Sequence, residues 1–137
     1  MKIFKDLNEG NLNDFLKNFN FETLDLEDED GNTPLHKLVK IQNIYGVETF
    51  ADLGANINAK NKKGDTPAHI AVEINDNEIF EILMNYGADL NIRNNSQRTP
   101  EQIAGMNNRR KILQIISNYN SDYGYTEKMK SHRKLED

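Results

Sequence analysis

The sequence predicts an all-α protein, an elongated solenoid of stacked helix-turn-helix units with protruding loops. Two patterns with the same spacing support this prediction. Tetrapeptides that begin with Thr-Pro recur every 33 residues, at Thr33, Thr66 and Thr99. The segment Gly-Ala-Asn-Ile-Asn, which starts at Gly54, returns as Gly-Ala-Asp-Leu-Asn from Gly87. A single period shared by two independent patterns is the sequence signature of a repeat architecture.

The composition fits one soluble domain with a real core. Of the 137 residues, 36% are hydrophobic, which argues against a disordered chain. There is no cysteine, so disulfides, cysteine nucleophiles and thiolate metal sites are excluded. The net charge of −5 argues against a nucleic-acid partner, and no apolar run is long enough for a signal peptide or a membrane span. We therefore expect a cytoplasmic protein with no membrane partner.

The first element of the predicted domain (residues 1–119) is an N-terminal cap over about residues 1–20. Apolar residues at helical spacing predict two short helices, over 2–8 and 12–19, and Gly10-Asn11 separates them. No Thr-Pro precedes this pair. A terminal unit of this kind is what a solenoid needs to keep its first repeat from exposing an apolar face.

An acidic segment follows, from Glu22 to Asp30. Its end, Asp-Glu-Asp-Gly, faintly resembles a calcium loop of the EF-hand type. With Gly31 at position 6 of such a loop, however, Leu26 and Lys37 would occupy positions 1 and 12, which need carboxylates. We therefore interpret the segment as a solvated acidic loop before a helix.

The first repeat covers residues 31–58. Thr33 is expected to cap a helix whose first residue is Pro34, where the missing N–H has no cost. A second helix is expected over about 45–53, ended by Gly54 in a left-handed conformation. Gly46 falls inside that helix, so this repeat is expected to be weaker, or its helix to begin later. The residues expected to share one face of the first helix are Leu35, Leu38, Val39 and Gln42, and those that the second helix presents to the core are Val47, Phe50 and Ala51.

The second repeat, residues 64–91, has the same organisation with a cleaner pattern. Thr66-Pro67 opens its first helix, and an amphipathic second helix is expected over 78–84 before Gly87. The third unit, residues 97–119, keeps Thr99-Pro100 but continues with Glu101 and Gln102. This more polar unit is expected to be a C-terminal cap, with Arg109, Arg110 and Lys111 on its polar side. The period is lost in residues 120–137, which we expect to form a flexible tail.

The repeats resemble those of the ankyrin-repeat family. Gly-Asn-Thr-Pro-Leu-His from Gly31 and Gly-Asp-Thr-Pro-Ala-His-Ile-Ala from Gly64 match its helix start, and the segments from Gly54 and Gly87 match its inter-repeat segment. The resemblance covers about residues 2–119. It implies a structural hydrogen-bonding role for His36 and His69. A shared metal site is the alternative for this pair, but equivalent positions on helices about 8–10 Å apart lie too far from each other.

No pattern in the sequence indicates catalysis. No serine lies in a nucleophile-elbow sequence, and the glycines do not form a phosphate-binding loop. We expect no enzyme activity, no cofactor and no metal. What remains is binding of a protein partner through the concave face and loop tips of the solenoid. The alternative is a dedicated inhibitor of a toxin or enzyme, such as an immunity protein or a pathogen's decoy, which would act in the host-cell cytosol if it is secreted.

The resemblance also implies where a partner binds, because ankyrin proteins usually engage partners through loop tips and the exposed side of each first helix. The expected apolar anchors are Ile41, Ile74 and Met106, joined by Tyr86, with packing on neighbouring repeats as the alternative. The loop tips change from acidic to basic along the chain, which could orient a partner or reflect ordinary solvated loops. The free protein is expected to be a monomer. The residues carried over as partner-binding are Glu29, Asp30, Asn32, Lys40, Ile41, Lys62, Lys63, Asp65, Glu73, Ile74, Asn95, Ser96, Arg98, Met106 and Asn107.

Overall fold

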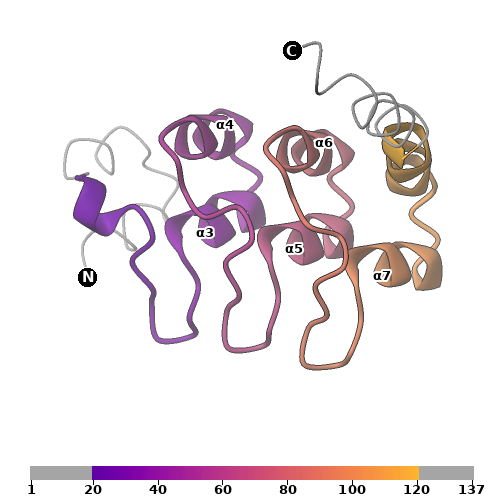
Figure 1. Ribbon diagram of the computed structural model, residues 1–137, viewed down its shortest axis with the longest axis horizontal. Helices are drawn as coiled ribbons and strands as arrows, with labels where there is room; N and C mark the ends of the chain where they lie inside the picture. The colour runs from indigo at the N-terminus through magenta and orange to yellow at the C-terminus, as the bar shows by residue number, and fades with distance from the viewer. Residues whose placement is uncertain (1–19, 121–137) are drawn as a thin grey trace, which may run out of the picture.

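The structure, a computed structural model, describes residues 20–120 as two rows of helices with long loops protruding from one edge (Figure 1). A short 3₁₀ helix, η1 (Phe21–Thr23), comes first. The inner row contains α3 (Pro34–Lys40), α5 (Pro67–Glu73) and α7 (Pro100–Met106). The outer row contains α4 (Ile44–Asp52), α6 (Asn77–Asn85) and a helix over residues 110–120. No strand occurs in this part of the chain, so the predicted all-α solenoid is confirmed.

Two predicted regions lie outside the described residues. They are the helices expected over 2–8 and 12–19 and the tail from residue 121 onward.

Each inner helix begins as the Thr-Pro pattern predicts. Thr33, Thr66 and Thr99 are the N-cap residues of α3, α5 and α7, and a proline follows each of them as the first helical residue. The threonine oxygen accepts a hydrogen bond from the backbone N–H three residues later, which satisfies a donor that the helix itself leaves unpaired. The three starts therefore share one geometry.

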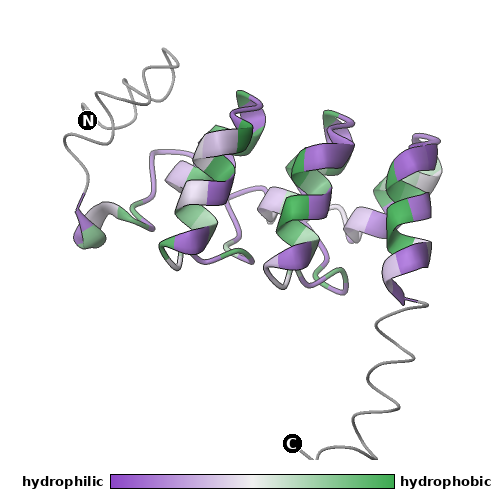
Figure 2. Cartoon of the chain, turned by 90° about the horizontal axis from the view of Figure 1, so that it is seen from above, coloured by the Kyte–Doolittle hydropathy of each residue, from purple (hydrophilic) through white to green (hydrophobic). Residues whose placement is uncertain are grey.

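The core lies between the two rows of helices. The hydrophobic residues of the outer helices lie along faces that Figure 2 shows as green stripes beside purple polar stripes. Because α3 contacts both α4 and α5, and α5 contacts both α6 and α7, one apolar layer continues through the stack. The side chains fully buried in it include Leu35, Leu38, Val39, Val47, Phe50, Ala71, Val72, Ile79, Phe80, Leu83, Ala104 and Ile112.

The prediction that Gln42 continues one face of the first helix is wrong. The helix α3 ends at Lys40, and Gln42 is exposed with a φ of 58°. Its side chain donates to Asp76 Oδ2 of the next repeat at 3.1 Å. The residues in register, Asn75 and Asn108, have φ values of 59° and 57°, so this turn needs the left-handed conformation in every unit.

The expectation that α4 starts late because of Gly46 is also wrong. The helix begins at Ile44, and Asn43 caps it by accepting from the Gly46 N–H at 2.9 Å. A Cβ atom on Gly46 would lie 2.6 Å from Leu38 Cδ2 of α3. The glycine is therefore explained by the close approach of α3 and α4.

The last unit differs from the others where it meets solvent. Ile112 and Ile116 are buried as predicted, while Leu113 and Ile115 are only partly buried. Arg109, placed by sequence among the polar residues, is partly buried and bonds back to the preceding repeat. Its Nε donates to the Val72 carbonyl at 3.2 Å and its Nη2 to the Glu73 carbonyl at 2.8 Å, which caps the end of α5.

Candidate functional site

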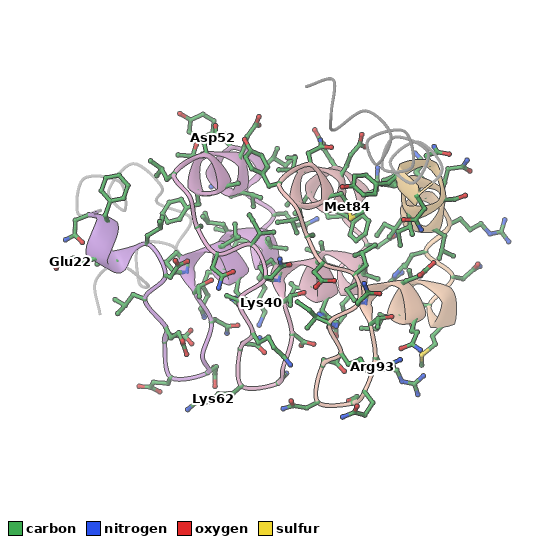
Figure 3. The ribbon with its side chains drawn as sticks, in the orientation of Figure 1. Glu22, Lys40, Asp52, Lys62, Met84 and Arg93 are labelled. Atoms are coloured by element: carbon green, nitrogen blue, oxygen red, sulfur yellow. The ribbon has the colours of Figure 1, made fainter. Side chains whose placement is uncertain are left out.

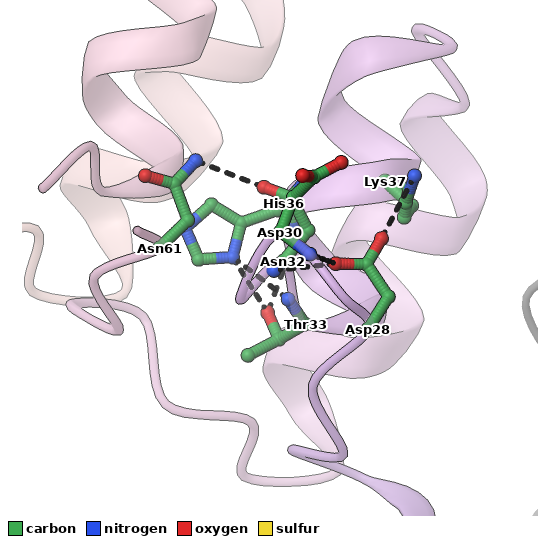
Figure 4. Close-up of polar contacts among 7 residues, drawn as sticks. All are labelled: Asp28, Asp30, Asn32, Thr33, His36, Lys37 and Asn61. Atoms are coloured by element: carbon green, nitrogen blue, oxygen red, sulfur yellow. Dashed lines mark hydrogen bonds and ion pairs between the residues drawn. The ribbon is translucent and has the colours of Figure 1, made fainter. Parts of the chain in front are cut away.

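Three loop tips protrude beside the inner helices: tip 1 (28–32), tip 2 (61–65) and tip 3 (94–98). In tip 1 the Asp28 Oδ1 atom accepts from the backbone N–H groups of Asp30 at 2.8 Å and Asn32 at 2.9 Å (Figure 4). Asn61 and Asn94 close tips 2 and 3 with the same pair of bonds. This role was not predicted from the sequence, although the 33-residue spacing of the three residues indicates it.

Neighbouring tips are bonded to each other. The Lys62 N–H donates to the Asp30 carbonyl at 3.0 Å, and the Asn95 N–H donates to the Lys63 carbonyl at 2.9 Å. The Asn95 side chain adds a bond to the Lys62 carbonyl at 2.7 Å. The backbone of tip 2 is thus held from both sides, and the three tips form one continuous wall.

Two of the predicted partner-binding residues lie inside this wall. Asn32 is 8% exposed and accepts from the Asn61 amide at 2.9 Å (Figure 4). Asp65 is 9% exposed and accepts from the Asn94 amide at the same distance. Their side chains join adjacent tips, so they stabilise the wall and contribute little to its exposed surface.

The two repeat histidines have the predicted structural role. The Thr33 N–H donates to His36 Nδ1 at 3.0 Å, so this nitrogen carries no proton, and Nε2–H donates to the Asp65 carbonyl of the next repeat at 2.9 Å. His69 repeats the arrangement with Thr66 and with the Arg98 carbonyl. Burial lowers the pKa of His36, because the interior disfavours the imidazolium, although the Asp65 carbonyl partly opposes the shift.

Close packing of the tips explains the glycines that precede Thr-Pro. Gly31 and Gly64 have φ values of 75° and 77°, and a Cβ atom on Gly64 would lie 2.8 Å from the Asn95 backbone nitrogen. Gln97 has the same conformation, with a φ of 63°, at the last tip of the described stack. A side chain is tolerated there because no further tip packs against that position among the described residues.

A groove runs between this wall and the inner helices. It has a volume of about 390 Å³ and spans tips 1 and 2 and helices α3 and α5. Figure 3 shows Lys40 above the loops and Lys62 at the end of a tip. The groove brings together predicted partner-binding residues from two repeats, and Asn61 and Ile70 complete its lining. The predicted residues that line it are Asp30, Asn32, Lys40, Lys62, Lys63, Asp65, Glu73 and Ile74.

The remaining predicted residues lie around the groove. A shallower hollow on the other side of tip 2 contains Asn95 and Ser96. Glu29 is exposed on tip 1, and Asn107 is exposed after α7. Ile41 is 37% exposed and Met106 is 60% exposed at the ends of their helices, whereas Ile74 is partly buried against the core. Arg98 donates to Met106 Sδ at 2.8 Å.

Tyr86 does not join these apolar residues. It caps the C-terminal end of α6, and its hydroxyl donates to Asp52 at the end of α4. Because paired helices run antiparallel, this end of the outer row lies opposite the turn that carries Ile41 and Ile74. The hydrogen bond to the Asp52 carboxylate raises the pKa of Tyr86.

The charges of tip 1 divide into paired and unpaired groups. Lys37 Nζ lies 3.0 Å from Asp28 Oδ2 (Figure 4). Burial alone would raise the pKa of Asp28, but the bonds from Lys37 and from the Asn32 and Asp30 N–H groups outweigh it and lower that pKa. Glu29 and Asp30 make no ion pair with any described residue, so they carry the exposed negative charge.

The described residues contain no cluster of three or more His, Cys, Asp or Glu side chains that could hold a metal ion. Across residues 20–120 no helix is both apolar and long enough to cross a membrane.

A family model described as "Ankyrin repeats (3 copies)" matches residues 39–127, which is more than half of the chain. No curated protein matches the sequence. The match covers tips 2 and 3 and every residue that lines the groove except Asp30 and Asn32, which precede it.

Proposed function

Because this chain belongs to the ankyrin-repeat family, we propose that it binds a protein partner through the groove and the three loop tips. Ankyrin repeats are generally non-catalytic modules of protein–protein interaction. The observation that carries the proposal is the groove itself, which brings charged side chains of the tips and inner helices together with the apolar Ile70 and Ile74. Charged groups beside apolar anchors, held without internal ion pairs, suit recognition of another protein.

The wall reduces the entropic cost of binding. The backbone N–H and carbonyl groups of Lys62 and Lys63 are all used, in bonds to Asp30, Asn61 and Asn95. Only the two side chains remain to be ordered when a partner docks, and a pre-formed surface loses less freedom on binding. The proposal includes a monomeric free protein in the cytosol, in accord with the absence of cysteine.

Affinity capture from the native host tests this function. The bait is the full chain, compared with a Lys62→Glu, Lys63→Glu variant and with a Glu48→Lys control on α4, outside the groove. We expect a stoichiometric partner that the wild type and the control retain and the groove variant loses. Retention by all three proteins, or by none, would contradict the proposed site.

The same experiment addresses the inhibitor alternative. A single captured enzyme or toxin whose activity falls on binding would identify an inhibitor. Several partners with unchanged activities would identify an adaptor. Both outcomes depend on surface residues, since the scaffold is common to the two functions.

A further inference from the structure

The exposed charges that line the groove alternate in sign between its two sides and from one repeat to the next. On the side of tip 1 the groove has Asp30, and across from it on α3 lies Lys40. One repeat further, the exposed signs are exchanged: tip 2 carries Lys62 and Lys63, with the Asp65 carboxylate buried beneath them, and α5 carries Glu73. Lys40 and Glu73 occupy equivalent positions 33 residues apart, so the helix row reverses its sign in the same step as the tips.

These charges are free to meet a partner. The described residues contain one ion pair, between Lys37 and Asp28, and neither residue lines the groove. The polar side chains of the floor are tied to neighbouring tips, because Asn32 accepts from Asn61 and Asp65 accepts from Asn94. The apolar part of the floor comes from Ile70 and Ile74. A ligand would therefore meet unpaired charges above a floor whose polar side chains are already held in place by the neighbouring tips.

We propose that the groove selects an extended partner segment with an apolar residue at its centre. Each side of that residue carries one positive and one negative side chain in the same order, which we call the alternating pattern. This inference rests on the proposed function and specifies its partner. The groove, of about 390 Å³, lies between a wall of loop tips and a row of helices that carry opposite exposed charges in each repeat. An extended chain suits two such walls, because its side chains point alternately to opposite sides.

The geometry of an extended chain fixes the order of the charges. Neighbouring repeats lie about 10 Å apart, and this distance is bracketed by two or four residues along one side of a strand, roughly 6.6 or 13 Å. A lysine facing Asp30 is followed by a glutamate facing Lys40. After a central apolar residue, a lysine faces Glu73 and a glutamate faces Lys62 and Lys63. The predicted core is Lys-Glu-Leu-Lys-Glu, and the reversed sequence fits when the chain runs in the opposite direction.

A pair of synthetic peptides with equal composition tests the pattern. One contains Lys-Glu-Leu-Lys-Glu and the other Lys-Lys-Leu-Glu-Glu, both flanked by Gly-Ser-Gly and blocked at their ends. In either direction, the second peptide places an opposite charge at only half of the charged positions of the groove. We expect the full-length protein to bind the alternating peptide about tenfold more tightly in an NMR titration, since each like-charge contact opposes binding. The shifted amide signals should belong to groove residues.

A charge exchange within the protein provides the reciprocal test. The Lys40→Glu, Glu73→Lys variant keeps the net charge but makes both charges near repeat 1 negative and those near repeat 2 positive. It should prefer the Lys-Lys-Leu-Glu-Glu peptide. The matched control, Lys60→Glu with Glu48→Lys, exchanges exposed charges outside the groove and should keep the wild-type preference.

Three results would overturn the inference: no binding of either peptide, equal binding of both, or a preference that the exchange leaves unchanged. Capture of the native partner remains a separate measurement. Loss of charge selectivity with continued partner capture at the groove would reject the alternating pattern and leave the proposed function standing, while failure of that capture would reject the proposed function.

Discussion

At the scale of single residues, His36 links two repeats through a neutral imidazole. Burial lowers its pKa in the folded protein, so the unfolded chain binds a proton more readily. The free energy of unfolding should therefore fall as the pH drops below about 6.5, and this contribution should be complete above that value. Urea denaturation at a series of pH values, with circular dichroism as the signal, measures the slope.

The His36→Gln variant is the control for this pH dependence. Glutamine cannot titrate, and Gln102 already forms the same bond to the Thr99 N–H, at 2.9 Å. The variant should be less stable at neutral pH by about 1–2 kcal/mol, because the bond to the Asp65 carbonyl is lost. Its stability should also vary less with pH in the acidic range. An unchanged slope would assign the pH dependence to other groups.

Gly64 and Gln97 occupy equivalent left-handed positions in different surroundings. Gly64→Ala should destabilise the protein by about 2 kcal/mol or more, because the new Cβ would meet the Asn95 backbone. Gln97→Gly should raise stability by roughly 0.5–1 kcal/mol, since it relieves a left-handed conformation that costs a side chain more than it costs glycine. Urea midpoints compare the two variants. Similar effects of the same sign would show that tip packing does not explain the glycines.

Individual residues were predictable where local chemistry or spacing decides their role. The Thr-Pro caps and the structural histidines follow from such rules. Gln42 was misplaced because helical spacing was extended past the residue at which α3 ends. Asn32 and Asp65 were assigned to the binding surface by position, but their burial depends on bonds from the next tip, which no single repeat contains.

At the scale of elements, α4 and α7 each contain a glycine. Replacing these glycines by alanine should change the stability of the protein in opposite directions. Gly105 of α7 has nothing within 4 Å of an added Cβ, so Gly105→Ala should stabilise the protein by about 0.5–1 kcal/mol. Gly46→Ala adds the same helix propensity but places its Cβ 2.6 Å from Leu38 Cδ2, inside the core. We expect a net loss of about 1 kcal/mol or more.

Thermal and urea unfolding of the two alanine variants give the comparison directly. If Gly46→Ala were as stabilising as Gly105→Ala, the approach of α3 to α4 would not be the reason for the glycine. Sequence alone gave the wrong expectation for this helix because propensity is a local quantity. The contact between Gly46 and Leu38 arises only after the helix pair has formed.

At the scale of the whole molecule, the binding surface is a product of stacking. The groove takes its walls from two tips and two inner helices, so it exists only where consecutive repeats pack at the observed spacing. The period predicted that such a concave surface would form. It could not predict which side chains share one groove, or that Tyr86 lies at the opposite end of the helix pairs. The first depends on how far each tip leans towards its neighbour, and the second on the antiparallel course of the paired helices.

The exposed charge of tip 1 provides a test of the whole surface. Glu29→Lys with Asp30→Lys should leave stability nearly unchanged, because both side chains are exposed and make no ion pair with any described residue. Affinity for the captured partner should fall by about tenfold or more, with a weaker salt dependence of association. Isothermal titration calorimetry at two salt concentrations measures both quantities.

Asp28→Asn separates this surface effect from the structure of the tip. Asparagine occupies the equivalent positions 61 and 94 and closes those tips with the same backbone bonds, so tip 1 should keep its shape. Only the ion pair with Lys37 is lost, which should cost about 1 kcal/mol or less for so small a change at a partly exposed site. Partner affinity should remain near the wild-type value, since Glu29 and Asp30 are retained. If Asp28→Asn weakened binding as much as the double reversal, the shape of the tip would determine recognition and its exposed carboxylates would not.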